Sequence, residues 1–291
     1  MPLGFETAMS EITLVLFTTL APSGAIACAI VAAVLIAAPL GELERSRINR
    51  ALCIPLVVTM VGLVASATHL GSPANALYVF FGIGRSPLSN EVLSAVLFLA
   101  ACGLYWLFCF SEKQHVRLQK LWCAFIIAAA LVCVGAIALA YDAPTIATWH
   151  TPFVPANVWL SACAGGPLLA MATLRVARAV CLHTAVSAAL LGASGAFLAA
   201  NVACLALQNM QLVGIWNGYG DAPGLVPQYP AMIVSYGAAG AAALIAAALP
   251  LRGGGLASPA RLVACNVLFF AGLFVVRFGF YMMHMTYGLG V

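Results

Sequence analysis

The chain has 291 residues, of which 64% are hydrophobic and 7% are charged. Soluble domains carry about 25% charged residues, so a chain of this composition cannot cover itself with a solvated surface. The composition excludes a soluble globular protein and predicts an all-α integral membrane protein. The net charge of +4 comes from the basic loops described below and does not indicate nucleic-acid binding.

Eight apolar stretches are long enough to cross a hydrocarbon core of about 30 Å. Alanine, leucine and valine dominate them, which favours transmembrane helices over the short alternating strands of a barrel. No disordered linker interrupts them, so residues 1–291 are interpreted as a single polytopic membrane domain. The predicted spans are 13–38, 52–68, 92–110, 121–139, 158–174, 185–207, 231–249 and 262–283.

Basic residues indicate the orientation of these spans. Ten of the twelve Lys and Arg residues fall in the four loops that follow the first, third, fifth and seventh spans. Loops rich in Lys and Arg stay in the cytoplasm, so both termini are predicted on the outer, periplasmic side. The outer connections, roughly 70–90, 141–157 and 208–230, are longer and suggest a docking surface or a lid.

A faint internal echo links residues 87–94 with residues 155–161. Each segment opens a helix that starts on the outer side. The echo suggests two four-helix bundles.

Titratable residues at the outer ends of the spans are the candidates for chemistry, because such groups are costly inside a bilayer. His69 ends the second span, where a histidine can accept a proton or bind a polar headgroup. It can equally be an interfacial side chain bonded to a loop carbonyl. Glu91 follows Ser89 and Asn90, which are expected to cap the third span. The carboxylate either complements the helix dipole or acts in a proton relay.

Arg277 is the strongest anomaly, because it lies inside the last span. Arg277, Tyr281 and His284 are spaced i, i+4 and i+7, so they are expected on one helix face. This stripe could bind a quinone oxygen or pair with Glu91. The alternative is that Arg277 extends its guanidinium to the membrane surface.

Other features favour structural roles. Trp149 is expected to be an interfacial anchor. The Gly165-Gly166-Pro167 segment should kink its helix and let a neighbour approach closely. The ten cysteines are scattered and no pair has C-x-x-C spacing, so no metal site or iron–sulfur cluster is expected in this chain.

Several short motifs follow one another along the chain. They are His69-Leu70-Gly71-Ser72-Pro73, Leu88-Ser89-Asn90-Glu91, Gly165-Gly166-Pro167-Leu168-Leu169, Leu225-Val226-Pro227, and Arg277 with Phe280-Tyr281 and His284-Met285-Thr286. This ordered set resembles the membrane-anchor subunits of respiratory dimethyl sulfoxide reductases, the DmsC family. The resemblance covers nearly the whole chain, and the length, helix number and outer termini agree with it.

The resemblance implies a subunit of the bacterial inner membrane that anchors a molybdopterin catalytic subunit and an iron–sulfur subunit. Such anchors oxidise menaquinol near the outer face and are not known for haem. The quinol-site histidine and glutamate of the family match His69 and Glu91. The chain would itself be non-catalytic for the terminal acceptor, dimethyl sulfoxide or a similar compound.

The expected mechanism makes His69 and Glu91 the catalytic proton acceptors for the two quinol protons, and electrons leave to an iron–sulfur partner. The expected quinol-binding set is His69, Ser72, Asn90, Glu91, Arg277, Tyr281 and His284. A cytochrome b-type anchor is an alternative, because His69 and His284 come from different helices and could hold a haem. A transporter is a further alternative and would place charged residues at mid-bilayer in both halves.

Overall fold

The computed structural model describes residues 3–68, 73–111, 115–218 and 220–286. Helices make up nearly all of it, because the apolar stretches can satisfy their backbone groups only within each segment. Its elements are α1 (Leu3–Ser10), α2 (Ile12–Ala37), α3 (Glu42–Ala51), α4 (Cys53–Thr68), the 3₁₀ helix η1 (Pro73–Gly82), α5 (Pro87–Phe108), α6 (Val116–Ala140), α7 (Phe153–Val176), α8 (Thr184–Leu212), β1 (Trp216–Asn217), β2 (Gly220–Asp221), α9 (Ala222–Leu225), α10 (Tyr229–Ala248), the 3₁₀ helix η2 (Leu249–Gly253) and α11 (Pro259–Met282).

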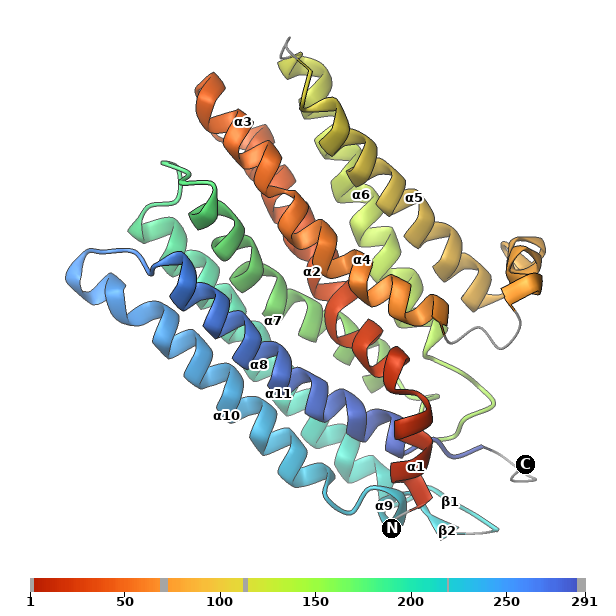
Figure 1. Cartoon of the computed structure of the whole chain (residues 1–291). Helices are drawn as coiled ribbons and strands as arrows, with labels where there is room; N and C mark the ends of the chain where they lie inside the picture. The colour runs from red at the N-terminus through yellow and green to blue at the C-terminus, as the bar shows by residue number, and fades with distance from the viewer. Residues whose placement is uncertain (1–2, 69–72, 112–114, 219, 287–291) are drawn as a thin grey trace.

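The structure confirms the eight predicted spans. Eight helical segments in the described chain are long and apolar enough to cross a membrane. They run side by side along one common direction (Figure 1). The second span is longer than predicted, because α3 and α4 follow each other almost without interruption from residue 42 to residue 68. The chain is therefore a multi-pass membrane protein.

Helix α2 lies at the centre of the array. It packs against α4, α6, α7 and α11, and most of its side chains are buried. Helix α7 approaches it closely where α7 carries two consecutive glycines. A Cβ atom added to Gly165 would lie 2.7 Å from the Ser23 hydroxyl, and one added to Gly166 would lie 2.5 Å from a methyl carbon of Ile26. The predicted close approach at this segment is confirmed, with α2 as the neighbour.

The last four spans pack in a ring. Helix α7 contacts α8, α8 contacts α10, α10 contacts α11, and α11 returns to α7. Among the first four spans, α2 contacts α4 and α6, and α5 contacts α6. The arrangement is compatible with two four-helix groups, but α2 packs about as extensively against α7 as against α4 or α6 alone, so the grouping stays a prediction.

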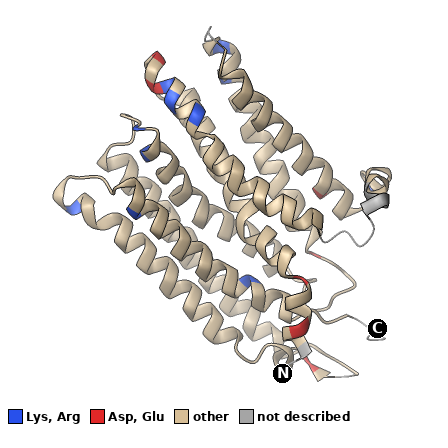
Figure 2. Ribbon diagram, viewed as in Figure 1, with Lys and Arg blue, Asp and Glu red and all other residues tan. Residues whose placement is uncertain are grey.

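The two ends of the array differ in what they carry. Both termini, η1, the β1–β2 hairpin and α9 lie at one end (Figure 1). Lys and Arg residues gather at the opposite end, where the loops are short (Figure 2). The hairpin pairs Trp216 with Asp221 and Asn217 with Gly220. The end with the termini is called the loop end below, and there α5 begins and α11 ends (Figure 1).

Candidate functional site

Glu91 lies in the second turn of α5, whose N-cap residue is Ser86. The Ser86 hydroxyl accepts a 3.5 Å hydrogen bond from the Ser89 backbone N–H. Asn90 uses its Oδ1 atom to accept a 2.7 Å hydrogen bond from the Gly84 backbone N–H in the preceding loop. The predicted capping by Ser89 and Asn90 is therefore wrong, and Glu91 is not among the first-turn residues that complement the helix dipole.

Glu91 faces the protein interior beside two tyrosines. Its side chain is 6% exposed. It lies close enough to Tyr141 and Tyr281 to interact electrostatically with both hydroxyl groups. The two hydroxyl oxygens are 2.7 Å apart, and the Tyr281 hydroxyl also donates a 3.1 Å hydrogen bond to the Leu14 carbonyl. Glu91, Tyr141 and Tyr281 are called the carboxyl–phenol cluster below.

Tyr141 directly follows the last residue of α6. Burial, reinforced by the neighbouring Tyr281 and Glu91, raises the pKa of Tyr141 well above its usual range. The phenol therefore stays protonated at physiological pH. It remains a hydrogen-bond donor inside the cluster.

The rings of Trp149 and Phe280 pack against both tyrosines of the carboxyl–phenol cluster. Trp149 stacks on Phe280 with ring centroids 4.7 Å apart, and its indole N–H donates a 3.3 Å hydrogen bond to the Phe280 carbonyl. Tyr141 meets the Trp149 ring at a centroid distance of 5.9 Å. Trp149 is 9% exposed, so its interpretation as an interfacial anchor is wrong.

Arg277 is buried on α11, with 5% of its surface exposed. One terminal nitrogen of its guanidinium donates to the Asn157 carbonyl at 3.1 Å and to the Ser161 hydroxyl at 2.6 Å. The guanidinium does not extend to the membrane surface, so the snorkelling interpretation is wrong. The expected pairing with Glu91 is also wrong, because the ion pairs found in the described chain do not include these two residues. The electrostatic neighbours of Arg277 are Tyr141, Tyr229, Tyr236 and Tyr281.

Three buried amides surround Arg277, and the sequence analysis missed them. Asn201 donates a 2.8 Å hydrogen bond to the Asn157 side-chain oxygen, and Asn157 donates one of the same length to Gln208. Tyr236 donates a 3.0 Å hydrogen bond to the Asn201 oxygen. The signal was available, because amides inside apolar spans commonly bond across helices. Asn157, Asn201, Gln208 and Tyr236 are called the amide network below.

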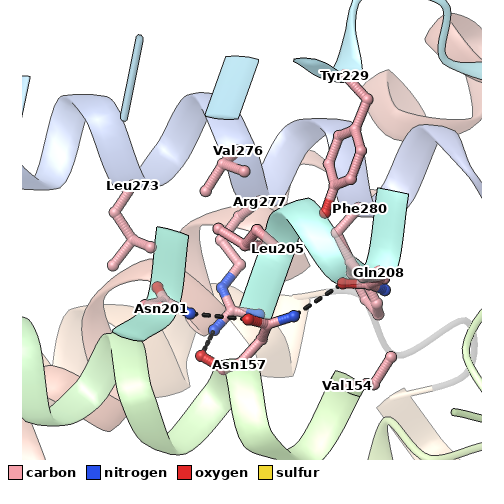
Figure 3. A pocket seen from close by; sticks show the side chains of 10 residues that line it. All are labelled: Val154, Asn157, Asn201, Leu205, Gln208, Tyr229, Leu273, Val276, Arg277 and Phe280. Carbon is pink, nitrogen blue, oxygen red and sulfur yellow. Dashed lines mark hydrogen bonds between the residues drawn. The ribbon is translucent and has the colours of Figure 1, made fainter. Parts of the chain in front are cut away.

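A narrow cavity adjoins Arg277 between α7, α8, α10 and α11 (Figure 3). Its polar lining consists of the three amides, Arg277 and Tyr229. It has room for about one water molecule, whereas a benzene ring needs a cavity of about 150 Å³. A quinol ring does not fit beside Arg277 in this arrangement.

The predicted stripe of Arg277, Tyr281 and His284 holds only in part. Arg277 and Tyr281 are both buried, but the guanidinium joins the amide network whereas the phenol joins the carboxyl–phenol cluster. His284 follows the end of α11 and is exposed, with its ring edge against Trp149 at a centroid distance of 5.0 Å. One of the two histidines expected of a haem site thus lies at the surface.

His69 and Ser72 lie outside the described residues. The described part of α4 ends at Thr68, immediately before His69. Within the described ranges, no three His, Cys, Asp or Glu side chains lie close enough together to hold a metal ion. The ten cysteines are free thiols.

Comparison with known families identifies the chain. The model of the DMSO reductase anchor subunit (DmsC) matches residues 5–289. The chain belongs to this family. Within the family, it is 32% identical over 250 residues to the anaerobic dimethyl sulfoxide reductase chain YnfH of Escherichia coli strain K12, covering 86% of this chain and 87% of that one.

Two further members are chains C of anaerobic dimethyl sulfoxide reductases. The one from Escherichia coli is 30% identical over 240 residues, covering 81% of each chain. The one from Haemophilus influenzae is 29% identical over 232 residues, covering 79% of this chain and 81% of that one. The resemblance seen in the motifs is confirmed, and the chain is a DMSO reductase-type anchor subunit.

Proposed function

We propose that this anchor subunit oxidises menaquinol near the periplasmic face of a bacterial inner membrane. The supporting observation is Glu91, a carboxyl group buried at the loop end of the array beside two phenols. A buried ionisable residue in a transmembrane helix marks a proton or substrate pathway by default. Helix α4 ends at the same end of the array, and His69, the next residue in the sequence, supplies a second proton acceptor in this proposal.

In the proposed reaction, menaquinol loses two protons and two electrons. His69 binds one quinol hydroxyl and accepts its proton, and Glu91 accepts the second proton. Tyr141 and Tyr281, which are hydrogen-bonded to each other, provide a polar surface beside the carboxyl group. Both protons then leave to the aqueous phase at the loop end, and the quinol becomes a quinone.

Ser72 and Asn90 are proposed to shape the entry to this site, since they flank His69 and Glu91 in the chain. His284 borders it from the surface through its contact with Trp149. Arg277 does not contact the quinol in this proposal, because its guanidinium is held by Asn157 and Ser161.

The two electrons are proposed to pass to an iron–sulfur subunit, which relays them to a molybdopterin subunit that reduces dimethyl sulfoxide or a similar acceptor. The relatives are named as chains of anaerobic dimethyl sulfoxide reductases, which supports an assembly of several subunits. The loop end also exposes large apolar side chains that a partner can cover: Leu77, Tyr78, Phe81, Val213 and Trp216.

The orientation in this proposal follows the charge distribution. Lys and Arg residues gather at the end opposite the termini (Figure 2). The positive-inside rule places that end in the cytoplasm and the carboxyl–phenol cluster on the periplasmic side. Fusing a reporter that is active only in the periplasm to the C-terminus tests this orientation.

The proposal is tested in the complete membrane-bound complex with two electron donors. A quinol analogue requires the site, whereas a small reduced dye feeds electrons directly to the partner subunits. Glu91→Gln and His69→Ala should each lower quinol-dependent turnover at least about 100-fold, as expected for loss of a general base, while dye-dependent turnover stays unchanged.

Asp142→Asn serves as the matched control, because this carboxylate lies at the same end but is part of an exposed pair with His150 at 2.8 Å. It should leave both activities unchanged. Full quinol-dependent turnover in Glu91→Gln would remove Glu91 from the mechanism.

A further inference from the structure

The positive charge of Arg277 has no carboxylate beside it in the described part of the chain. The guanidinium contacts a carbonyl and a hydroxyl, and its electrostatic neighbours are tyrosines. Arginine stays protonated in proteins. An unpaired charge buried among transmembrane helices is costly, so a compensating negative charge is expected near it.

Two hydrogen-bond donors at this place lack an acceptor among the described residues. They are the Nε–H of Arg277 and the hydroxyl of Tyr229, and both side chains are more than nine-tenths buried. A third donor, the Gln208 amide nitrogen, meets the Met283 sulfur at 4.0 Å, which is a weak contact. All three donor residues line the narrow cavity (Figure 3).

The side-chain amide oxygens around the cavity each accept a hydrogen bond already. The Asn157 side-chain oxygen accepts from Asn201, the Gln208 oxygen accepts from Asn157, and the Asn201 oxygen accepts from Tyr236. The cavity-lining polar atoms that lack any partner among the described residues are the Nε–H of Arg277 and the hydroxyl of Tyr229, and both can donate. Two free donors beside a buried positive charge are the lining that a small anion requires.

We propose that this cavity binds one monoatomic anion of the size of chloride, held by the Nε–H of Arg277 and the hydroxyl of Tyr229. The space for about one water molecule matches a single halide and excludes carboxylates, sulfate and phosphate. The bound anion neutralises Arg277 and stabilises the packing of α7, α8, α10 and α11. This site is separate from the carboxyl–phenol cluster and does not depend on quinol oxidation.

The first test measures the thermal unfolding of the complete complex in detergent. Chloride or bromide is titrated against isethionate, an organic sulfonate too large for the cavity, at constant ionic strength. A ligand that binds only the folded state raises the unfolding temperature in a saturable manner. Stabilisation of the anchor subunit by both halides and not by isethionate is the expected result.

Two tyrosine variants on α10 make the test specific. Tyr229→Phe removes one proposed donor to the anion and should weaken the apparent halide affinity about tenfold, the loss typical of a hydrogen bond to a charged group. Tyr236→Phe removes a similarly buried hydroxyl that bonds to Asn201 and does not line the cavity. It should lower the unfolding temperature while leaving the halide affinity unchanged.

Arg277→Gln should abolish the halide effect, and Tyr229→Phe decides the matter if that variant does not fold. A direct measurement is anomalous X-ray scattering from crystals grown in bromide. A bromine peak within hydrogen-bond distance of Arg277 and Tyr229 supports the proposal. Equal stability in all salts, equal halide affinity in both tyrosine variants, or density for a neutral water without anomalous signal overturns it.

Discussion

The hydroxyl oxygens of Tyr141 and Tyr281 lie 2.7 Å apart and join the end of α6 to the last turn of α11 beside Glu91. The three residues come from the third, fourth and eighth spans. Because each phenol is fixed by the other and by the surrounding rings, the carboxyl group of Glu91 has a rigid polar wall on one side. The proposed proton acceptor is thus positioned by residues far apart in sequence.

Removing the Tyr141 hydroxyl should impair quinol oxidation without disturbing assembly. Tyr141→Phe keeps the ring in its aromatic contacts but removes the partner of Tyr281. We expect quinol-dependent turnover to fall about tenfold, corresponding to one lost hydrogen bond near a charged group, while dye-dependent turnover is retained. The measurement is the ratio of the two activities in membranes across a pH series.

The matched control for this prediction is Tyr105→Phe. Tyr105 is also buried and donates a 2.8 Å hydrogen bond to the Asn49 side chain, near the basic end of the array. It should lose stability but keep the activity ratio of the unmodified protein. If Tyr141→Phe and Tyr105→Phe have the same activity ratio, the carboxyl–phenol cluster has no role in quinol oxidation.

Replacing the central amide of the amide network should destabilise the last four spans. Asn157→Ala leaves Asn201 without its acceptor and Gln208 without its donor, and each buried orphan costs about 1–3 kcal/mol. Ser187→Ala is the control, because that buried hydroxyl on α8 has no hydrogen-bond partner among the described residues. In denaturant titrations, Asn157→Ala should unfold at a lower denaturant concentration than Ser187→Ala. Equal unfolding midpoints would show that the amide network does not stabilise the last four spans.

The eight spans were predictable because length and hydropathy decide them locally. Glu91 and Arg277 could be singled out because a charged residue inside or beside an apolar run is visible in the sequence alone. What could not be predicted was the partner of each. Arg277 bonds to a carbonyl and a hydroxyl of α7, more than a hundred residues away, and no local pattern encodes that contact.

The amide network also could not be predicted, although its residues show a pattern in the sequence. Asn201 and Gln208 are seven residues apart and share one face of α8, so the sequence contains the pattern. Single amides in a membrane span are tolerated for many reasons, however. Only the packing of α7, α8 and α10 shows that these amides meet. The burial of Trp149 was missed for the same reason, because a tryptophan in a loop is usually an anchor.

Glu44 should control the order of the turn between α7 and α8. Its carboxylate on α3 accepts hydrogen bonds from the backbone N–H groups of Val180 and Cys181 at 2.7 and 3.1 Å. Glu44→Ala removes these acceptors, so amide hydrogen exchange at both residues should accelerate at least about tenfold through local opening. Glu44→Gln retains an acceptor oxygen and should keep most of the protection. Equal exchange rates in the unmodified protein and both variants would show that these hydrogen bonds do not hold the turn.

The close approach of α2 and α7 should make Gly166 intolerant of any side chain. A Cβ atom there would lie 2.5 Å from the Ile26 Cγ2 atom and 2.8 Å from its Cβ atom, so Gly166→Ala must push the two helices apart and should cost about 1–3 kcal/mol. At Gly192, on α8, a Cβ atom meets no described neighbour within 4 Å. Gly192→Ala should therefore be neutral or stabilise by up to about 1 kcal/mol through helix propensity. The decisive measurement is a double-mutant cycle: Ile26→Ala makes room for the new methyl group, so Gly166→Ala should cost much less in that background. An undiminished cost there would mean that the glycine serves backbone flexibility and not the packing of α2 against α7.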